Sequence, residues 1–268
     1  MDNDYLFLVF FTILCQSAAG FFILREIIIY SSGIFLNDKH LRIITLLITG
    51  LLVLAGIITA SFHLGQPLQA VHTLRNLKSS WLSREIFFII IFSGTVLLYL
   101  LSEIFTEACS FRIPLSVAGI LGCAGLIICM SGIYMLKSVP VWNTFLTPAS
   151  FVITPALMAI SLMLFILPDS SGNCLNSKNS LIFIFLSLVL VFSLVISTVF
   201  YFSGKSSHAL LFITRMVTGI MAISILVLIY TGIIPNKMPA RLFLLLLLLS
   251  SETAGRCIFY ISFHVKGL

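Results

Sequence analysis

The sequence has very few charged residues for its length. Of its 268 residues only 9% are Asp, Glu, Lys or Arg, whereas 60% are hydrophobic and the mean hydropathy is +1.17. A water-soluble protein of this size could not bury so much apolar surface and cover the remainder with so few charges. The composition therefore excludes a soluble globular protein and predicts a chain embedded in a lipid bilayer.

Cysteine pairs with a metal-binding spacing are also absent. The six cysteines form no CxxC motif, and four of them fall inside hydrophobic runs, where cysteine is commonly a small apolar side chain. We therefore expect no structural disulfide, no metal site and no iron–sulfur cluster held by this chain alone. A haem b cytochrome is disfavoured as well, because no two of the five histidines lie well inside two different hydrophobic runs.

Long uncharged runs are the main feature that the sequence does contain. A helix needs roughly 20 apolar residues to cross a hydrocarbon core about 30 Å thick. The runs do not alternate between polar and apolar residues, which argues against the strands of a membrane barrel. We predict an all-α integral membrane protein, a bundle of eight transmembrane helices in a single transmembrane domain over residues 1–268. The predicted spans are Tyr5–Leu24, Ile43–Phe62, Ile86–Ser102, Ile113–Leu136, Ala149–Leu167, Leu181–Phe202, Met216–Ile234 and Leu242–Phe263.

The net charge of +6 is not concentrated in one basic patch. Lys and Arg are spread through the predicted connections, which is typical of headgroup anchors and topology signals rather than of a nucleic-acid surface. When Arg256 is left out because it lies inside the last span, the predicted loops on the two sides carry equal numbers of cations. The positive-inside rule therefore leaves the orientation undecided.

The connection between the second and third spans, "SFHLGQPLQAVHTLRNLKSSWLSREIF", is unusually rich in polar side chains. His63 closes the second span and Glu85 opens the third, so both lie at one membrane face. An imidazole and a carboxylate at the same level can accept hydrogen bonds or protons from the two hydroxyls of a quinol. The alternative is ordinary helix capping, with Ser83 as N-cap and Glu85 in the first turn. The residues alone leave both interpretations open.

Other polar side chains lie inside the predicted spans. Glu252 and Arg256 are four residues apart in the last span, so they share a helix face, and they predict either a structural ion pair or a contact for a proton or quinone. Gln16 in the first span predicts an interhelical hydrogen bond or, alternatively, a ligand contact. The prolines of "KSVPVWNTFLTPASF" predict a surface loop with Trp142 at the membrane interface, and Pro155 predicts a kink or a first-turn position.

The polar connection resembles the signature of a known family. "HLGQPLQAVHTLRNLKSSWLSREI" is similar to the H-L-G-x-P motif, the following Ala and N-L stretch and the final Ser-Leu-Ser-x-Glu run of the DmsC family, the membrane anchor subunits of bacterial anaerobic dimethyl sulfoxide reductase. The likeness continues in "FTILCQSAAGFF", "VPVWNTFLTP" and "ETAGRCIFY", and it covers nearly the whole chain. Arg25, Glu26, Trp81 and Arg84 have no place in this pattern.

The resemblance implies a subunit of a three-subunit enzyme of anaerobic respiration in the bacterial inner membrane. Its partners would be a molybdopterin catalytic subunit that reduces an S-oxide or N-oxide and a subunit with four iron–sulfur clusters. This chain would hold both at the membrane, oxidise menaquinol and bind no haem or metal. The family's quinol-binding residues correspond to His63 and Glu85, with Gly65, Pro67 and Arg75 in the same connection. This chain would be non-catalytic alone; the alternative function is a stand-alone membrane transporter, although no inverted repeat is evident.

Overall fold

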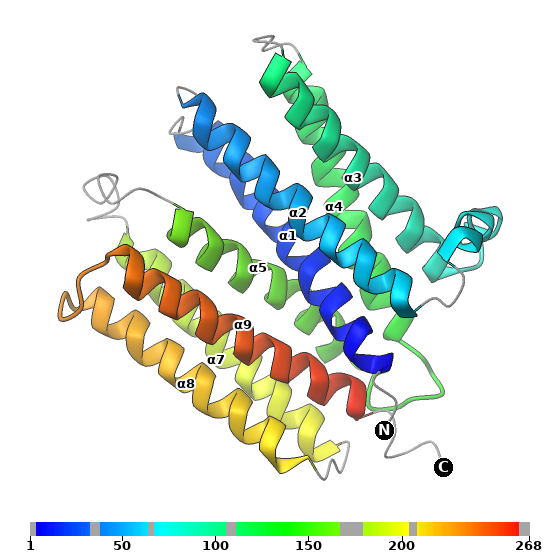
Figure 1. The fold of residues 1–268 in the computed structure, drawn as a ribbon. Coiled ribbons are helices and arrows are strands. Elements are labelled where there is room, and N and C mark those ends of the chain that lie inside the picture. The colour runs from blue at the N-terminus through cyan, green and yellow to red at the C-terminus, as the bar shows by residue number, and fades with distance from the viewer. Residues whose placement is uncertain are drawn as a thin grey trace. The chain divides into compact units, whose positions relative to one another are not determined.

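The computed structural model describes residues 4–32, 38–63, 67–105, 111–166, 179–203 and 208–262. Over these residues it contains helices and no strand, and eight of the helices are long and apolar enough to cross a membrane, which confirms the predicted all-α membrane fold (Figure 1). The elements are α1 (Asp4–Ser32), α2 (Lys39–His63), the 3₁₀ helix η1 (Pro67–Asn76), α3 (Trp81–Phe105), α4 (Arg112–Tyr134), α5 (Leu146–Ile166), α7 (Asn179–Ser203), α8 (Ala209–Tyr230) and α9 (Met238–Ile261).

The chain divides into two compact units, Met1–Leu136 and Lys137–Leu268, and each is described by itself. In the first unit α1 packs against α2 and α4, and α3 packs against α2 and α4. In the second unit α9 contacts α5, α7 and α8. The prediction that residues 1–268 form a single transmembrane domain stays a prediction.

Two helices of the first unit extend beyond the predicted spans. The first span was expected to end at Leu24, but α1 continues to Ser32 and carries Arg25 and Glu26, which are 0% and 1% exposed. The charges do not end the helix, because neighbouring helices supply partners for them. The third span was expected to begin at Ile86, but α3 begins five residues earlier, at Trp81.

The start of α3 bears on the capping interpretation of Glu85. The hydroxyl of Ser80 accepts a hydrogen bond from the amide of Ser83 over 3.3 Å, so Ser80 is the capping residue. Ser83 is a buried residue inside the helix, and no acidic residue lies in its first turn. Glu85 therefore lies one turn deeper than expected, and the capping interpretation is wrong for this residue.

The second unit is held together partly by Trp142. This side chain was predicted at the membrane interface, but it is buried: its indole N–H donates to the carbonyl of Phe259 over 3.0 Å and to Ser262 Oγ over 3.1 Å. The ring also stacks on Phe259 with 5.0 Å between centroids. Trp142 thus fixes the connection that precedes α5 against the end of α9. Pro155 lies inside α5, beyond its first turn.

Candidate functional site

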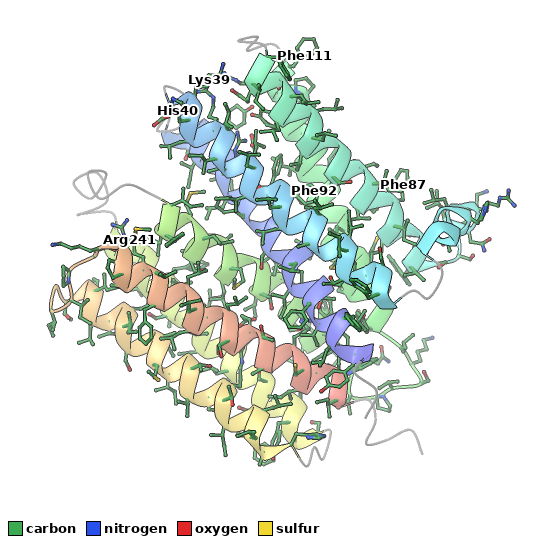
Figure 2. The ribbon with its side chains drawn as sticks, in the orientation of Figure 1. Lys39, His40, Phe87, Phe92, Phe111 and Arg241 are labelled. Atoms are coloured by element: carbon green, nitrogen blue, oxygen red, sulfur yellow. The ribbon has the colours of Figure 1, made fainter. Side chains whose placement is uncertain are left out.

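One end of the first unit combines the end of α2, the helix η1 and the start of α3. α2 ends at His63, η1 packs against α3, and Glu85 is 6% exposed in the second turn of α3. Figure 2 shows η1 beside the start of α3, with Phe87 and Phe92 marking the course of that helix. The thiols of Cys15 on α1 and Cys129 on α4 lie within electrostatic range of Glu85. Cysteines of α1 and α4 therefore lie in the surroundings of this carboxylate on α3.

Glu85 differs from the other buried glutamates of the described chain. Glu26, Glu103 and Glu252 each form an ion pair with at least one arginine. Within the described ranges, Glu85 forms no ion pair with a lysine or an arginine. A buried carboxylate is costly unless it is paired or protonated. Glu85 thus has no fixed cation among the described residues.

Of the other predicted site residues, Arg75 is exposed in the last turn of η1. His63 is the last residue of α2 and Pro67 the first of η1, whereas Gly65 and the side chains of His63 and Pro67 lie outside the described residues. The structure thus brings the backbone at His63, η1 and Glu85 to one end of the unit.

Arg84, which had no place in the family pattern, ties the connection to α3. Its guanidinium donates to the carbonyl of Leu77 over 2.8 Å and to that of Lys78 over 2.6 Å. It also lies over the ring of Trp81, 4.5 Å from the centroid. These contacts fix the segment between η1 and α3, and so stabilise the connection in front of Glu85.

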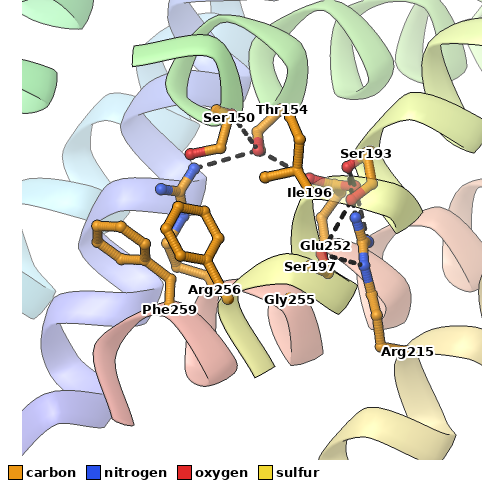
Figure 3. Close-up of a pocket in the computed structure, with 11 residues that line it drawn as sticks. Ser150, Thr154, Ser193, Ile196, Ser197, Arg215, Glu252, Gly255, Arg256 and Phe259 are labelled. Atoms are coloured by element: carbon orange, nitrogen blue, oxygen red, sulfur yellow. Dashed lines mark hydrogen bonds and ion pairs between the residues drawn. The ribbon is translucent and has the colours of Figure 1, made fainter. Parts of the chain in front are cut away.

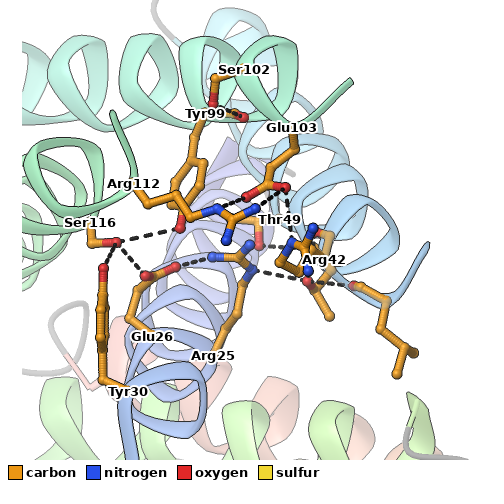
Figure 4. A network of polar contacts seen from close by, with 12 residues as sticks. Arg25, Glu26, Tyr30, Arg42, Thr49, Tyr99, Ser102, Glu103, Arg112 and Ser116 are labelled. Atoms are coloured by element: carbon orange, nitrogen blue, oxygen red, sulfur yellow. Dashed lines mark hydrogen bonds and ion pairs between the residues drawn. The ribbon is translucent and has the colours of Figure 1, made fainter. Parts of the chain in front are cut away.

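A second polar cluster occupies the other end of the first unit (Figure 4). Arg25 Nε donates to Thr45 Oγ1 over 2.9 Å and pairs with Glu26 through Nη1. Glu26 in turn accepts a hydrogen bond from Ser116, whose hydroxyl lies 3.1 Å from the hydroxyl of Tyr30. Sequence reasoning missed this cluster, because Arg25 was counted as a loop cation.

Glu103 completes this end of the unit by accepting hydrogen bonds from Arg42 and Arg112, each over 2.9 Å. One carboxylate thus links α2, α3 and α4. Glu103 follows Glu85 by 18 residues, which corresponds to about 27 Å along a helix at 1.5 Å per residue. The paired carboxylates therefore stabilise one end of the unit, and the carboxylate without an arginine among the described residues lies at the other.

The second unit contains a third cluster, shown in Figure 3. Glu252 is paired with Arg215 of α8 over 2.7 Å and accepts a hydrogen bond from Thr154 over 2.7 Å. Arg256 donates to the same threonine hydroxyl over 3.1 Å and lies 4.0 Å from the centroid of the Phe151 ring. The cluster lines a cavity of about 20 Å³, room for about one water molecule. Glu252 and Arg256 are thus linked through Thr154, and the direct partner of Glu252, Arg215, was missed as another loop cation.

Gln16 and the described cysteines lie in the helix interiors. Gln16 is fully buried in α1. Four cysteines are free and buried in the described part of the chain: Cys15, Cys123, Cys129 and Cys257. Over the same residues no three His, Cys, Asp or Glu side chains gather in a way that could hold a metal ion.

Comparison with known proteins gives two matches. The family model of the DMSO reductase anchor subunit (DmsC) matches residues 1–261. The protein is also similar to the C subunit of the anaerobic dimethyl sulfoxide reductase of Haemophilus influenzae, with 28% identity over 162 residues, and this match covers 58% of the protein and 56% of that relative. The protein thus aligns with little more than half of that relative's length. No solved structure matches.

The family match extends over both units, from α1 to the end of α9. Together with the eight apolar helices it makes the chain a multi-pass protein of the bacterial inner membrane. The chain belongs to the family of DMSO reductase anchor subunits, DmsC.

Proposed function

We propose that this chain anchors an S-oxide or N-oxide reductase to the membrane and oxidises menaquinol for it. The complex would be a heterotrimer with a molybdopterin catalytic subunit and a four-cluster iron–sulfur subunit. Membership of the anchor family and the name of the Haemophilus influenzae relative support this proposal over the stand-alone transporter. The observation that carries the quinol-oxidising role is the burial of Glu85 without an arginine partner among the described residues.

The chemistry needs two acceptors at the quinol. Oxidation of one quinol to the quinone releases two electrons and two protons. Glu85 accepts the proton of one hydroxyl, and His63 accepts a hydrogen bond from the other hydroxyl and then takes up its proton. The iron–sulfur clusters of the partner subunit would take up the two electrons and supply them for reduction of the oxide. Arg84 and η1 hold the connection that covers this end of α3.

The experiment is to replace Glu85 by Gln in the assembled complex. The amide keeps the shape of the side chain but cannot accept the proton. Activity driven by menaquinol should fall by roughly 10²–10⁴-fold, the usual loss of a general base. Activity with an artificial donor that reduces the partner subunits directly should remain, because the anchor is then bypassed. An unchanged ratio of the two activities would place the quinol site elsewhere.

Two control variants separate catalysis from folding. Glu103→Gln is the same change in a buried carboxylate of the same helix, and because it disrupts a structural ion pair, it should lower both activities together. Ser80→Ala removes the helix cap but leaves Glu85 in place, so any loss should again be shared by both donors. If either control lowered the ratio of menaquinol-driven to artificial-donor activity as much as Glu85→Gln does, the role of Glu85 as the proton acceptor would be refuted.

A further inference from the structure

A groove of about 280 Å³ lies between α2 and α3. Leu47, Gly50 and Ile57 line it from α2, and Ser93 and Val96 line it from α3. Among the described residues of the lining Ser93 is the one with a polar side chain, and its hydroxyl donates back to the carbonyl of Ile90 over 3.2 Å. The groove therefore presents hydrocarbon to any occupant and suits an apolar chain rather than a polar headgroup.

The rim of the groove is open at the surface of the first unit. Leu51 is 64% exposed, Leu54 54% and Leu97 56%, and all three contribute to the lining. In a bilayer this surface is within reach of hydrocarbon chains. An isoprenoid or acyl chain can thus enter sideways from the membrane without passing through water.

The groove is built on the two helices that meet at the candidate quinol site. Ile57 precedes His63 by six residues, about 9 Å along α2, and Ser93 follows Glu85 by eight residues, about 12 Å along α3. Val96 follows Glu85 by 11 residues, close to three full turns, so the two side chains project from nearly the same face of α3. The groove therefore lies deeper along the same helix pair as the headgroup site.

We propose that this groove binds the isoprenoid tail of the quinol whose headgroup reacts at Glu85. The inference rests on the proposed function. Its basis is continuity: Val96 of the groove lining lies about three turns along α3 from Glu85 and on nearly the same face of the helix. Tail burial here contributes affinity through apolar contact, and it directs the headgroup toward the start of α3.

Two glycines allow a matched test. A Cβ added at Gly50 would lie 3.7 Å from Val96 Cγ1, an ordinary contact, so this position of the groove lining has room for the start of a side chain. A Cβ added at Gly94, on α3 but outside the groove lining, meets nothing within 4 Å. Gly50→Phe therefore fills the groove, and Gly94→Phe adds the same side chain to a neighbouring open surface.

The measurement is the KM of the membrane-bound complex for two donors, a long-tailed menaquinol and the tail-less naphthoquinol menadiol. Gly50→Phe should raise the KM for the long-tailed donor by roughly tenfold or more, since isoprenoid carbons lose their apolar contact. The KM for menadiol should stay within about twofold of the parent, a free-energy change under 0.5 kcal/mol. Gly94→Phe should leave both values unchanged.

Two outcomes would overturn the tail groove. Equal KM values in Gly50→Phe and the parent for both donors would mean that the groove holds a phospholipid acyl chain or nothing. Equal rises for both donors would mean damage to the headgroup site. Gly50→Leu, a smaller change, repeats the test if Gly50→Phe does not assemble. If only the tail groove is wrong, Glu85→Gln still lowers the ratio of menaquinol-driven to artificial-donor activity. If the proposed function is wrong, that ratio stays at the parent value in Glu85→Gln.

Discussion

Arg215 on α8 donates a hydrogen bond to a carboxylate oxygen of Glu252 on α9 over 2.7 Å, and both side chains are buried. The same Nη1 atom also donates to Ser251 over 2.9 Å, and Arg215 Nε donates to Ser197 over 3.2 Å. The arginine thus connects α7, α8 and α9 around one carboxylate. Such a pair is expensive to break, because each partner left alone is a charge without a partner at membrane depth.

Removing one partner of this pair should therefore be worse than removing both. Arg215→Met or Glu252→Gln alone should lower the free energy of unfolding by about 3–5 kcal/mol, whereas the double variant should lose clearly less than the sum. The amount of protein in the membrane and its thermal unfolding in detergent measure this coupling. As a comparison, the double variant Glu252→Gln/Arg256→Met should regain less of the free energy of unfolding than Arg215→Met/Glu252→Gln does. The reason is that Arg256 reaches Glu252 through Thr154. Strict additivity of Arg215→Met and Glu252→Gln would contradict the pairing.

Glu103 should be among the more sensitive positions of the first unit. Glu103→Gln leaves Arg42 and Arg112 without their shared carboxylate, so the protein should accumulate poorly in the membrane. Arg112→Met should be milder, because the Arg42 pair survives and Arg112 is the more exposed arginine, at 14% against 8%. Quantitative immunoblots of membranes carrying each variant check the order. If Arg112→Met were as damaging as Glu103→Gln, Glu103 would not be the centre of the cluster.

Trp142 should stabilise the second unit by its hydrogen bonds as well as by its volume. Trp142→Phe keeps an aromatic ring against Phe259 but loses the indole N–H. We therefore expect the free energy of unfolding to fall by about 1–3 kcal/mol. Trp142→Ala also leaves a cavity and should cost about 3–5 kcal/mol. Thermal unfolding of the purified protein in detergent distinguishes the two. A Trp142→Ala variant as stable as the parent would show that this contact does not hold the unit together.

Gly122 should resist even a small side chain. A Cβ there would lie 3.3 Å from the Cα and Cβ of Phe92, so α3 and α4 would have to move apart. We expect Gly122→Ala to destabilise the first unit by about 1–3 kcal/mol. Gly94→Ala, in open space on α3, should be neutral or stabilising by up to about 1 kcal/mol through helix propensity. Equal unfolding temperatures for the two variants would contradict the close approach of the helices at Gly122.

Hydropathy alone was sufficient to predict the helices of this protein. A bilayer accepts only segments that satisfy their own backbone hydrogen bonds, and eight long apolar runs therefore correspond to eight long helices. The residues from His63 to Glu85 also indicated the family correctly, since that pattern depends on residue types and spacing within one short segment. Both are local properties, which a linear sequence records directly.

Only the tertiary structure decided which charges are buried and with what they pair. Arg25, Arg42 and Arg215 look like loop cations in the sequence, because hydropathy places the end of a span at the first charge. Their partners belong to other helices or, for Arg25, partly to its own neighbour Glu26. A buried charge is tolerated when the facing helix supplies the opposite charge or a hydroxyl, and no periodicity within one helix encodes that.

The same reason explains the position of Glu85. Sequence reasoning placed it at the membrane face, either as an acceptor for a quinol or in a first helical turn capped by Ser83. The hydrogen bond to Ser80 moves the start of α3 toward the N-terminus, and packing within the first unit buries the carboxylate without an arginine partner among the described residues. The residue type is written in the sequence, but burial and the lack of a counter-charge depend on what surrounding helices present to it.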